Sequence, residues 1–374
     1  MLIQQIADRI FPGRAWIALA CLLTATLLPH SALFAQVVKI TPLGSKTGEF
    51  CFLDRAMIFE DPTGVRILYD PGVTVAGSSD PRLGSIDVAL LSHVHFDHIG
   101  DAKLNQDPSA EDAKCDSSIP TTPAAPVSNL AEIIAAKSAA FIGTGGDATF
   151  LSTRITGLTG ICGGDPFSSA PITVPVQGPC ISPTFYGATR TVQRAGASAG
   201  VQISLVMAKH DNAVPATLLP ESLASDLATQ GLVYEPGDPV GYLITFTNGL
   251  TVYLSGDTGQ TTDMATVVRD QYHAKLAVIN IGDAFTMGPE QAAWAVNKLI
   301  RPRSVIPSHA NEVATRNGQV IPGTRTATFL HLVEAAAYVP LSGRTMDFDA
   351  RGRCVVGCGS EAVIRPYSDQ EPLN

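Results

Sequence analysis

Four side chains that can bind a transition metal stand within six positions of this 374-residue sequence. They form the pattern His93-x-His95-x-Asp97-His98. Three imidazoles and one carboxylate suit Zn²⁺ and related transition metals better than Ca²⁺, which prefers oxygen ligands. Because the whole chain has eight histidines, three of them in one short segment are hard to explain by core packing. The segment therefore predicts a metal site.

The pattern indicates two metal ions rather than one. Adjacent Asp97 and His98 cannot easily join the other two side chains on a single small cation. A two-metal site needs further ligands, preferably with a carboxylate that bridges the ions. His210, Asp257 and His309 are the candidates, because each stands just beyond an expected strand. The remaining histidines have no such setting and are expected to be structural or surface residues: His30, His273 and His331.

The expected strands place these side chains together. Ile86–Leu91 is almost continuously apolar, as in a buried strand, and runs directly into the metal pattern. Helices are expected over Asn129–Ala139, over Asp147–Ile155 and after Gly288-Pro289. Strands that alternate with helices indicate an α/β protein with its site at one edge of its sheets. The other expected strands are Val37–Thr41, Met57–Glu60, Val65–Tyr69, Val201–Ala208, Gly241–Thr247, Leu250–Ser255, Leu276–Ile281 and Ser304–Pro307.

The N-terminus has the features of a secretory signal peptide. Arg9 and Arg14 precede the uncharged apolar run Ala15–Leu28. At about 1.5 Å per residue this run spans about 21 Å, too short for a bilayer core of about 30 Å. We therefore expect residues 1–35 to be a signal peptide and the mature chain to start at Gln36. A buried N-terminal helix is the alternative.

Cysteine usage agrees with export. The six cysteines after residue 35 allow up to three disulfides in an oxidising compartment, and the sequence leaves their pairing open. Cys354 and Cys358 could close a tight turn, whereas Cys51 could instead be a buried free thiol. The expected location is the periplasm or the medium outside the cell. The six residues are Cys51, Cys115, Cys162, Cys180, Cys354 and Cys358.

Composition limits the class of protein and its partners. With 45% hydrophobic and 16% charged residues, the chain is not of the disordered class. A net charge of −9 without a basic run disfavours nucleic acid. The expected partner is a small-molecule substrate, with no stable membrane span in the mature chain and no prediction of oligomeric state. Residues 36–374 are expected to form one domain with Pro- and Gly-rich insertions near 101–128 and 157–190.

Beyond the metal pattern, further motifs resemble the metallo-β-lactamase superfamily over residues 37–345. The segment Ile281–Glu290 is similar to the metal-dependent hydrolase branch related to ascorbate-6-phosphate lactonase. The resemblance implies an αββα sandwich with a binuclear site at the edge of two facing sheets. The motifs are Ser92–His98, Ala208-Lys209-His210, Ser255-Gly256-Asp257-Thr258-Gly259 and Pro307-Ser308-His309.

The resemblance also implies roles for individual residues. Two divalent metal ions are expected, with Zn²⁺ favoured and Mn or Fe as alternatives. Asp70 would support the ligands from behind. Asp97 would also be catalytic, by orienting the attacking hydroxide and taking up a proton. The implied ligands are His93, His95 and His210 for metal 1, Asp97, His98 and His309 for metal 2, and Asp257 between both.

The expected reaction is hydrolysis of an ester, a lactone or a phosphorylated sugar-type substrate by a metal-bound hydroxide. Asp283 and Thr286 precede a helix and could bind an anionic substrate group or simply cap that helix. The branch usually has serine after the third histidine, whereas Asp211-Asn212 stand here. A non-hydrolytic metal-binding protein or an iron-dependent oxidoreductase is the alternative. A β-lactamase is disfavoured, because those enzymes do not use a bridging aspartate at the position of Asp257.

Overall fold

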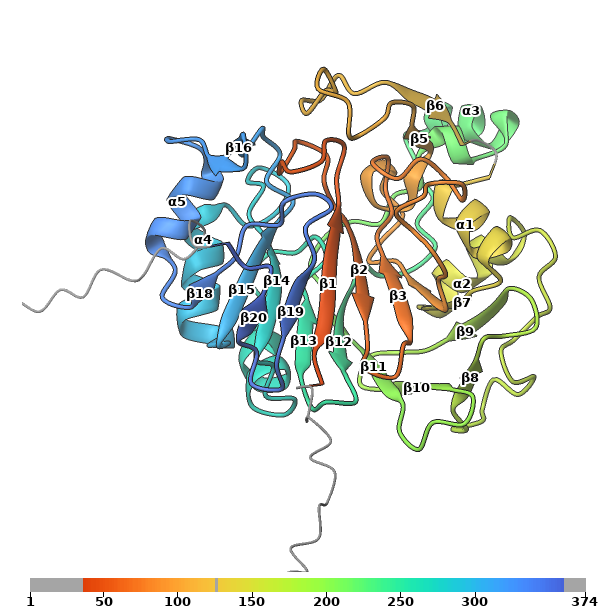
Figure 1. Ribbon diagram of the computed structural model, residues 1–374. Helices are drawn as coiled ribbons and strands as arrows, with labels where there is room; N and C mark the ends of the chain where they lie inside the picture. Colours follow the sequence, from red (N-terminus) through yellow and green to blue (C-terminus); the bar gives the residue numbers. More distant parts are fainter. Residues whose placement is uncertain (1–35, 125–126, 360–374) are drawn as a thin grey trace, which may run out of the picture. The chain divides into compact units, whose positions relative to one another are not determined.

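Two β-sheets of eight strands each form the centre of the protein (Figure 1). The computed structural model describes residues 36–124 and 127–359. The signal peptide predicted for residues 1–35 lies outside this part. In the first sheet the strands follow the order β20 (Cys354–Val356), β19 (Met346–Phe348), β1 (Val38–Leu43), β2 (Ala56–Glu60), β3 (Arg66–Tyr69), β4 (Val88–Leu90), β7 (Ala140–Gly143) and β9 (Cys180–Pro183).

The second sheet has a matching run of parallel strands. Strands β13, β14, β15 and β18 are parallel in one sheet, as β3, β4, β7 and β9 are in the other. Carboxyl ends of parallel strands meet at one edge, which is where ligands bind in open α/β sheets. The order of the second sheet is β18 (Ala336–Ala337), β15 (Ser304–Ser308), β14 (Leu276–Asn280), β13 (Thr251–Leu254), β12 (Val240–Thr245), β11 (Val201–Met207), β10 (Thr189–Arg194) and β8 (Ile172–Val174).

The two sheets pack face to face through apolar side chains. Ile40 and Phe59 of the first sheet share one buried cluster with Ile203 and Val252 of the second. Phe59 also stacks on Phe246, with ring centroids 6.3 Å apart. The alternation of inward-facing side chains along each strand makes this shared core possible.

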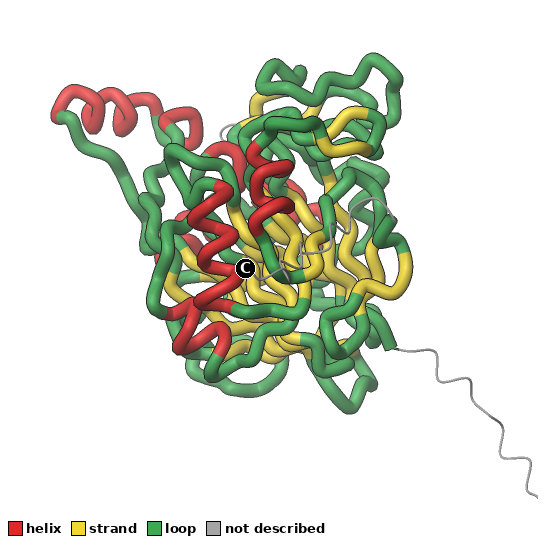
Figure 2. The backbone as a smooth tube through the Cα atoms, turned by 90° about the vertical axis from the view of Figure 1, so that its left-hand side faces the viewer, coloured by secondary structure: helices red, strands yellow, loops and turns green. Residues whose placement is uncertain are grey.

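Helices cover the outer face of each sheet. The helices α1 (Asn129–Lys137) and α2 (Gly145–Ser152) pack on the first sheet through a separate apolar cluster. The second sheet is covered by α4 (Pro289–Trp294), its π-helical continuation η4 (Ala295–Ile300) and α5 (Arg325–Leu332). Figure 2, seen from that side, shows these helices in front of the strands. The α/β class and the αββα arrangement are therefore as predicted.

Three short helical elements and two hairpins connect the main strands and helices. The π-turn η3 (Met264–Arg269) packs on the second sheet, and the 3₁₀ turn η2 (Ala216–Leu218) leads into α3 (Glu221–Gln230). No residue of α3 is buried. Two short hairpins lie outside the sheets: β5 (Ala102–Leu104) with β6 (Thr121–Pro123), and β16 (Thr315–Arg316) with β17 (Gln319–Val320).

The second insertion differs from the expectation. The sequence indicates only a Pro- and Gly-rich insertion over 157–190, yet β8 and β9 within it extend the two sheets, with Ile172 and Val174 in the core between the sheets. Strands of three and four residues leave too few apolar positions for a periodic signal. The Pro-rich insertion expected near 101–128 also contains regular structure, since β5 and β6 form a hairpin there.

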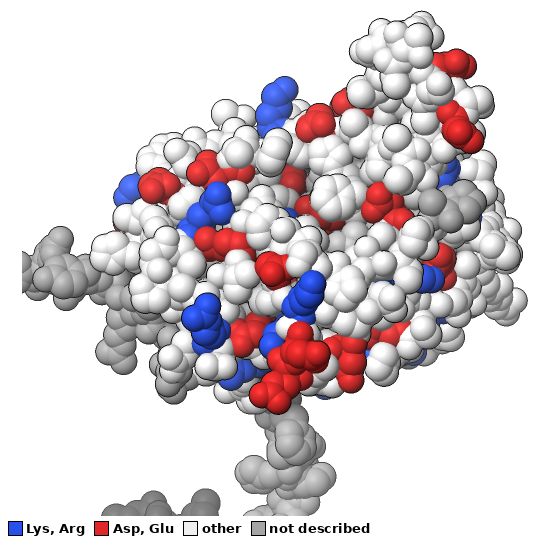
Figure 3. Space-filling view, turned by 90° about the horizontal axis from the view of Figure 1, so that it is seen from above, with Lys and Arg blue, Asp and Glu red and all other residues white. Residues whose placement is uncertain are grey.

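All six cysteines of the described part are paired. The disulfides are Cys51–Cys115, Cys162–Cys180 and Cys354–Cys358. The alternative of a free thiol at Cys51 is therefore wrong, and the tight turn closed by Cys354 and Cys358 is present. None of the helices between residues 36 and 359 that the structure describes combines the length and hydropathy needed to cross a bilayer. On the face seen in Figure 3, basic side chains are scattered among acidic and uncharged ones.

Candidate metal centre

Five polar side chains stand just after the carboxyl ends of strands. Asp70 follows β3 and His93 comes shortly after β4 in the first sheet, whereas His210, Asp257 and His309 follow β11, β13 and β15 in the second. The facing sheets thus bring side chains from distant parts of the chain to one edge. His273 and His331 are exposed and lie outside this cluster.

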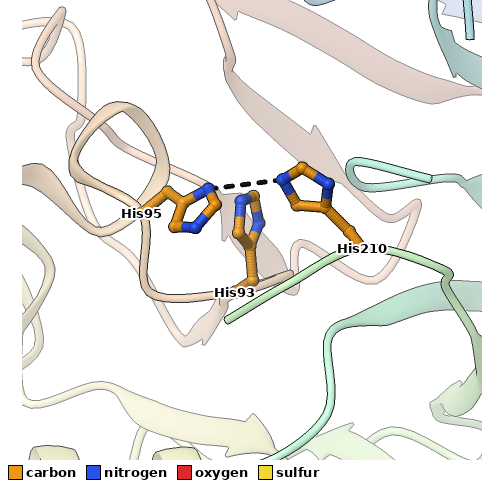
Figure 4. A group of neighbouring side chains, drawn as sticks. All are labelled: His93, His95 and His210. Atoms are coloured by element: carbon orange, nitrogen blue, oxygen red, sulfur yellow. Dashed lines mark hydrogen bonds between the residues drawn. The ribbon is translucent and has the colours of Figure 1, made fainter. Parts of the chain in front are cut away.

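The first ligand group consists of three histidines (Figure 4). The ligand atoms of His93, His95 and His210 all lie within 4.8 Å of one another. His95 Nδ1 and His210 Nε2 are 3.3 Å apart. The rings come from both sheets and converge on one point, which is the arrangement of a three-histidine site with an open fourth position.

The second group joins the other end of the metal pattern to the last predicted ligand. Asp97, His98 and His309 again place their ligand atoms within 4.8 Å. Asp97 Oδ2 lies 3.3 Å from His309 Nε2 and 3.7 Å from His98 Nε2. Asp97 and His98 belong to η1 (Phe96–Gly100), a single π-helical turn, a feature that is common at functional sites.

Asp257 reaches both groups. Its Oδ2 lies 2.9 Å from His309 Nε2 and 3.8 Å from His210 Nε2. Its Oδ1 lies 3.4 Å from His98 Nε2. One carboxylate therefore contacts a ligand of the first group and two of the second, with its two oxygens turned to different partners. This is the geometry that a bridging ligand needs.

Unpartnered polar atoms show that the centre fits cations. His93 Nε2, His98 Nε2 and Asp257 Oδ1 are buried without a hydrogen-bond partner among the described residues. Each such atom costs about 1–3 kcal/mol when it has no compensating contact. The ligand atoms of these three residues lie within 4.8 Å of one another, and imidazole nitrogens with carboxylates are a donor set for transition metals. The residues present therefore fit metal binding.

Electrostatics at the centre also favour positive charge. Burial opposes protonation of His98, but the carboxylates of Asp257, Asp97 and Asp70 outweigh it and raise the pKa of His98 to about 10. Burial would raise the pKa of Asp257, yet His309 and His98 hold it well below its usual range. Asp257 is therefore ionised, and its Oδ1 lies 3.4 Å from Nε2 of His98. A bound cation would take the place of the proton that this surrounding otherwise stabilises.

Asp70 contacts the proposed ligand His98 on the ring nitrogen that would not bind a metal. Its Oδ2 lies 2.8 Å from His98 Nδ1 and accepts a 2.7 Å hydrogen bond from the hydroxyl of Ser92. A carboxylate on the second nitrogen fixes the ring and its tautomer, so that Nε2 of His98 is left for a metal. Gly72, which follows Asp70 closely and has a φ of 49°, lets the backbone after β3 pack against the backbone of Asp97. A Cβ at Gly72 would lie 2.2 Å from the carbonyl oxygen of Asp97.

Arg55 is a functional candidate that the sequence analysis did not identify. Its side chain is 2% exposed, and Nε donates a 3.1 Å hydrogen bond to Asp97 Oδ2. Nη2 donates to Asn311 Oδ1 at 2.6 Å, on the loop that carries His309. The sequence offered little signal for this role, since a lone arginine before an apolar strand belongs to no recognisable motif.

Asn212 is the second unforeseen residue, and it explains part of the unusual Asp211-Asn212 pair. Its buried side chain accepts a 2.6 Å hydrogen bond from the backbone of Val94 and donates to the carbonyl of Gly237. It thereby ties the loop of His93 and His95 to the second sheet. Asp211, in contrast, is largely exposed and contacts His95 Nε2 at 3.2 Å.

A cavity of about 680 Å³ opens onto the ligands. Asp283 lines it, whereas Thr286 does not; the Thr286 hydroxyl instead donates to the carbonyl of Met287. The interpretation of both residues as helix caps was wrong, because α4 has Gly288 at its N-cap and no side-chain cap. The lining residues are Phe52, Leu53, His95, Phe96, Asp97, His210, Asp211, Asp257, Gly282, Asp283, Ala284, Phe285, His309, Asn311 and Arg325.

Comparison with known proteins agrees with this geometry. Residues 49–309 match the family model of the β-lactamase superfamily domain. A UPF0173 metal-dependent hydrolase of Cupriavidus necator is 27% identical over 84% of this chain and 91% of its own length. A UPF0173 metal-dependent hydrolase of Cupriavidus metallidurans is 30% identical over 66% of this chain and 67% of its own length.

Solved structures share the fold. Igni18, a metallo hydrolase of the archaeon Ignicoccus hospitalis, superimposes with a TM-score of 0.51 and 22% identity, over 84% of this chain and 99% of its own. The family match, the related hydrolases and the convergent His/Asp groups all indicate a metal-dependent hydrolase. The chain therefore belongs to the metallo-β-lactamase superfamily and is a metal-dependent hydrolase.

Proposed function

We propose that the protein is a binuclear hydrolase that cleaves an ester-type bond, in an ester, a lactone or a phosphorylated sugar. The observation that carries this proposal is the position of Asp257, whose two oxygens reach ligands of both groups. Two bound ions would lower the pKa of water to about 7 and polarise the bond to be cleaved. The residues that would hold them are His93, His95 and His210 for one ion and Asp97, His98 and His309 for the other, with Asp257 shared.

The donor set favours Zn²⁺, with Mn or Fe as alternatives. Imidazole-rich sites with carboxylates accept several first-row metals, and availability decides between them. Asp70 would support binding of any of these metals, because its contact with His98 Nδ1 leaves Nε2 of the same ring free to bind the ion.

Asp97 is the residue proposed to move the proton. Its contacts within the described residues use Oδ2, which leaves Oδ1 to accept a proton from the attacking water and return it to the leaving oxygen. Burial would favour the neutral acid, but His98, His309 and Arg55 keep the pKa of Asp97 well below its usual range. The carboxylate is therefore ionised and able to accept.

Replacement of Asp97 tests this role. Asp97→Asn keeps the shape of the side chain and removes its charge, so kcat on ester and lactone substrates should fall about 10²–10⁴-fold at saturating Zn²⁺, the usual size of a general acid–base effect. Asp226→Asn, on exposed α3, is the control and should retain full activity. Unchanged kcat in metal-replete Asp97→Asn would contradict the role.

We also propose that the protein is exported, to the periplasm or out of the cell. The three cysteine pairs support this, because disulfides persist in oxidising compartments. N-terminal sequencing of the mature protein should then begin at Gln36. A cytoplasmic product that retains Arg9 would overturn the proposal.

A further inference from the structure

The cavity above the metal centre has an apolar wall that the hydrolytic reaction itself does not require. Phe96 is 48% exposed although it stands between the ligands His95 and Asp97, and Phe285 is 76% exposed on the loop after β14. Phe52 and Leu53 add further apolar surface to the same lining. Exposed aromatic side chains that gather around one cavity mark a binding surface for an apolar group.

Part of this wall is held in place by neighbouring structure. Phe52 follows Cys51, which is bonded to Cys115, and its amide donates a 2.9 Å hydrogen bond to the carbonyl of Cys115. Phe96 begins the π-turn η1, which carries two proposed ligands. Its position is therefore fixed by the metal loop. Such pre-organised apolar surface lowers the entropy cost of binding.

The part of the lining that carries Phe285 has an unusual backbone. Asp283 and Ala284 both have left-handed conformations, with φ of 60° and 55°. The amide of Phe285 donates to the carbonyl of Asp283 at 2.6 Å, which closes a tight turn. This turn carries Phe285, whose exposed side chain lines the same cavity as Phe96.

Charges around the cavity do not suit a phosphorylated substrate. Apart from the proposed ligands, the lining has two carboxylates, Asp211 and Asp283, and one cation, Arg325. Arg325 already donates to the carbonyl oxygens of Ala310 and Asn311. Phosphate sites normally combine several cationic or backbone donors.

We propose that this cavity selects uncharged carboxylic esters or lactones with a medium-length acyl or an aryl group, and that it discriminates against phosphorylated substrates. The inference rests on the proposed ester hydrolysis and narrows it. The apolar group would lie between Phe96 and Phe285, with the ester carbon toward Asp97. A volume of about 680 Å³ lies within the range of small-molecule sites, roughly 300–1,000 Å³.

Matched substrates test the selectivity by activity. On p-nitrophenyl esters from acetate to octanoate, kcat/KM should rise by up to about fourfold for each added methylene until the cavity is filled. The p-nitrophenyl phosphate mono- and diesters, with the same leaving group, should be cleaved at least about 10²-fold less efficiently, a ratio of the size that unfavourable polar contacts produce. Phe285→Ala should flatten the chain-length series, whereas Phe167→Ala, at a side chain that is 94% exposed and outside the cavity lining, should not.

A binding assay tests the apolar surface without the reaction. The purified protein should bind the neutral fluorophore Nile red, which it cannot hydrolyse. Phe285→Ala should weaken that binding about tenfold relative to wild type and Phe167→Ala, consistent with loss of most of one aromatic contact. Equal efficiency on acetate and octanoate, or preference for a phosphate ester, would overturn the substrate class while ester hydrolysis stands. Failure to cleave any ester would overturn the proposed function, and the Nile red result would then decide the apolar cavity alone.

Discussion

The metal centre and the Cys162–Cys180 segment are stabilised in opposite ways. At the centre, buried side chains from both sheets contact one another, as Asp70 does with Ser92 and His98. The segment between the two cysteines contributes only the short strand β8 to a sheet edge and leaves Phe167 94% exposed. A disulfide closes it. Changes at the centre should therefore alter the chemistry, whereas changes in the segment should alter stability alone.

The largest effect on stability at the centre is expected from Arg55→Met. Removal of a buried partner leaves Asp97 without its guanidinium contact, which typically costs about 3–5 kcal/mol in the free energy of unfolding. Urea denaturation measures this cost, and Arg55→Lys should recover part of it. The control is Lys298→Met, from an exposed pair with Glu334, which should lose less than about 1 kcal/mol. An equal loss in both variants would contradict a special role for Arg55.

Removal of disulfides separates the two regions further. A disulfide stabilises more when it closes a longer loop, and the loops of Cys51–Cys115, Cys162–Cys180 and Cys354–Cys358 span 64, 18 and 4 residues. Replacing both cysteines of a pair by serine should therefore lower the free energy of unfolding by about 4, 3 and 2 kcal/mol, in that order. Thermal unfolding measures the order. Only loss of Cys51–Cys115 should also raise KM, because Phe52 beside it lines the cavity. A raised KM after loss of Cys162–Cys180 would break the comparison.

Asp54 provides a smaller, pH-dependent effect outside the ligands. Burial raises the pKa of its carboxyl from 3.8 to about 6, although it accepts hydrogen bonds from the amides of Ser45 and Cys51. The pKa of Asp54 is higher in the folded protein than in the unfolded chain. The contribution of this carboxyl to the free energy of unfolding is therefore full below about pH 4 and is lost as pH rises through 6. Relative to Asp54→Asn, wild type should lose up to about 3 kcal/mol between pH 4 and 7. A difference that is constant with pH would contradict the raised pKa.

The elements that carry long apolar runs could be predicted from the sequence. Ile86–Leu91 predicted the position of β4, and the expected strands Gly241–Thr247 and Leu250–Ser255 correspond to the paired strands β12 and β13. Short edge strands could not be predicted in this way. Strand β8 has two buried apolar side chains, Ile172 and Val174, and it depends on pairing with β10, a contact that no local pattern encodes.

The same distinction holds at the site. The histidine pattern and the polar residues after strands indicated all seven proposed ligands, because metal chemistry leaves a local signature of residue types. Arg55 and Asn212 have no such signature, since an arginine or asparagine acquires its role only from the partner that the fold brings to it. Their contacts join segments that are 42 and 118 residues apart.

The proposed binuclear centre depends most on Asp257 as a ligand shared by two ions. The direct measurement is the metal content of purified, Zn²⁺-saturated protein by elemental analysis, alongside Asp257→Ala and Asp226→Asn. Wild type and Asp226→Asn should each hold close to two ions per chain. Asp257→Ala should lose affinity for both, because the shared carboxylate binds each ion and screens their mutual repulsion. One ion in wild type, or two tightly held ions in Asp257→Ala, would contradict the binuclear assignment.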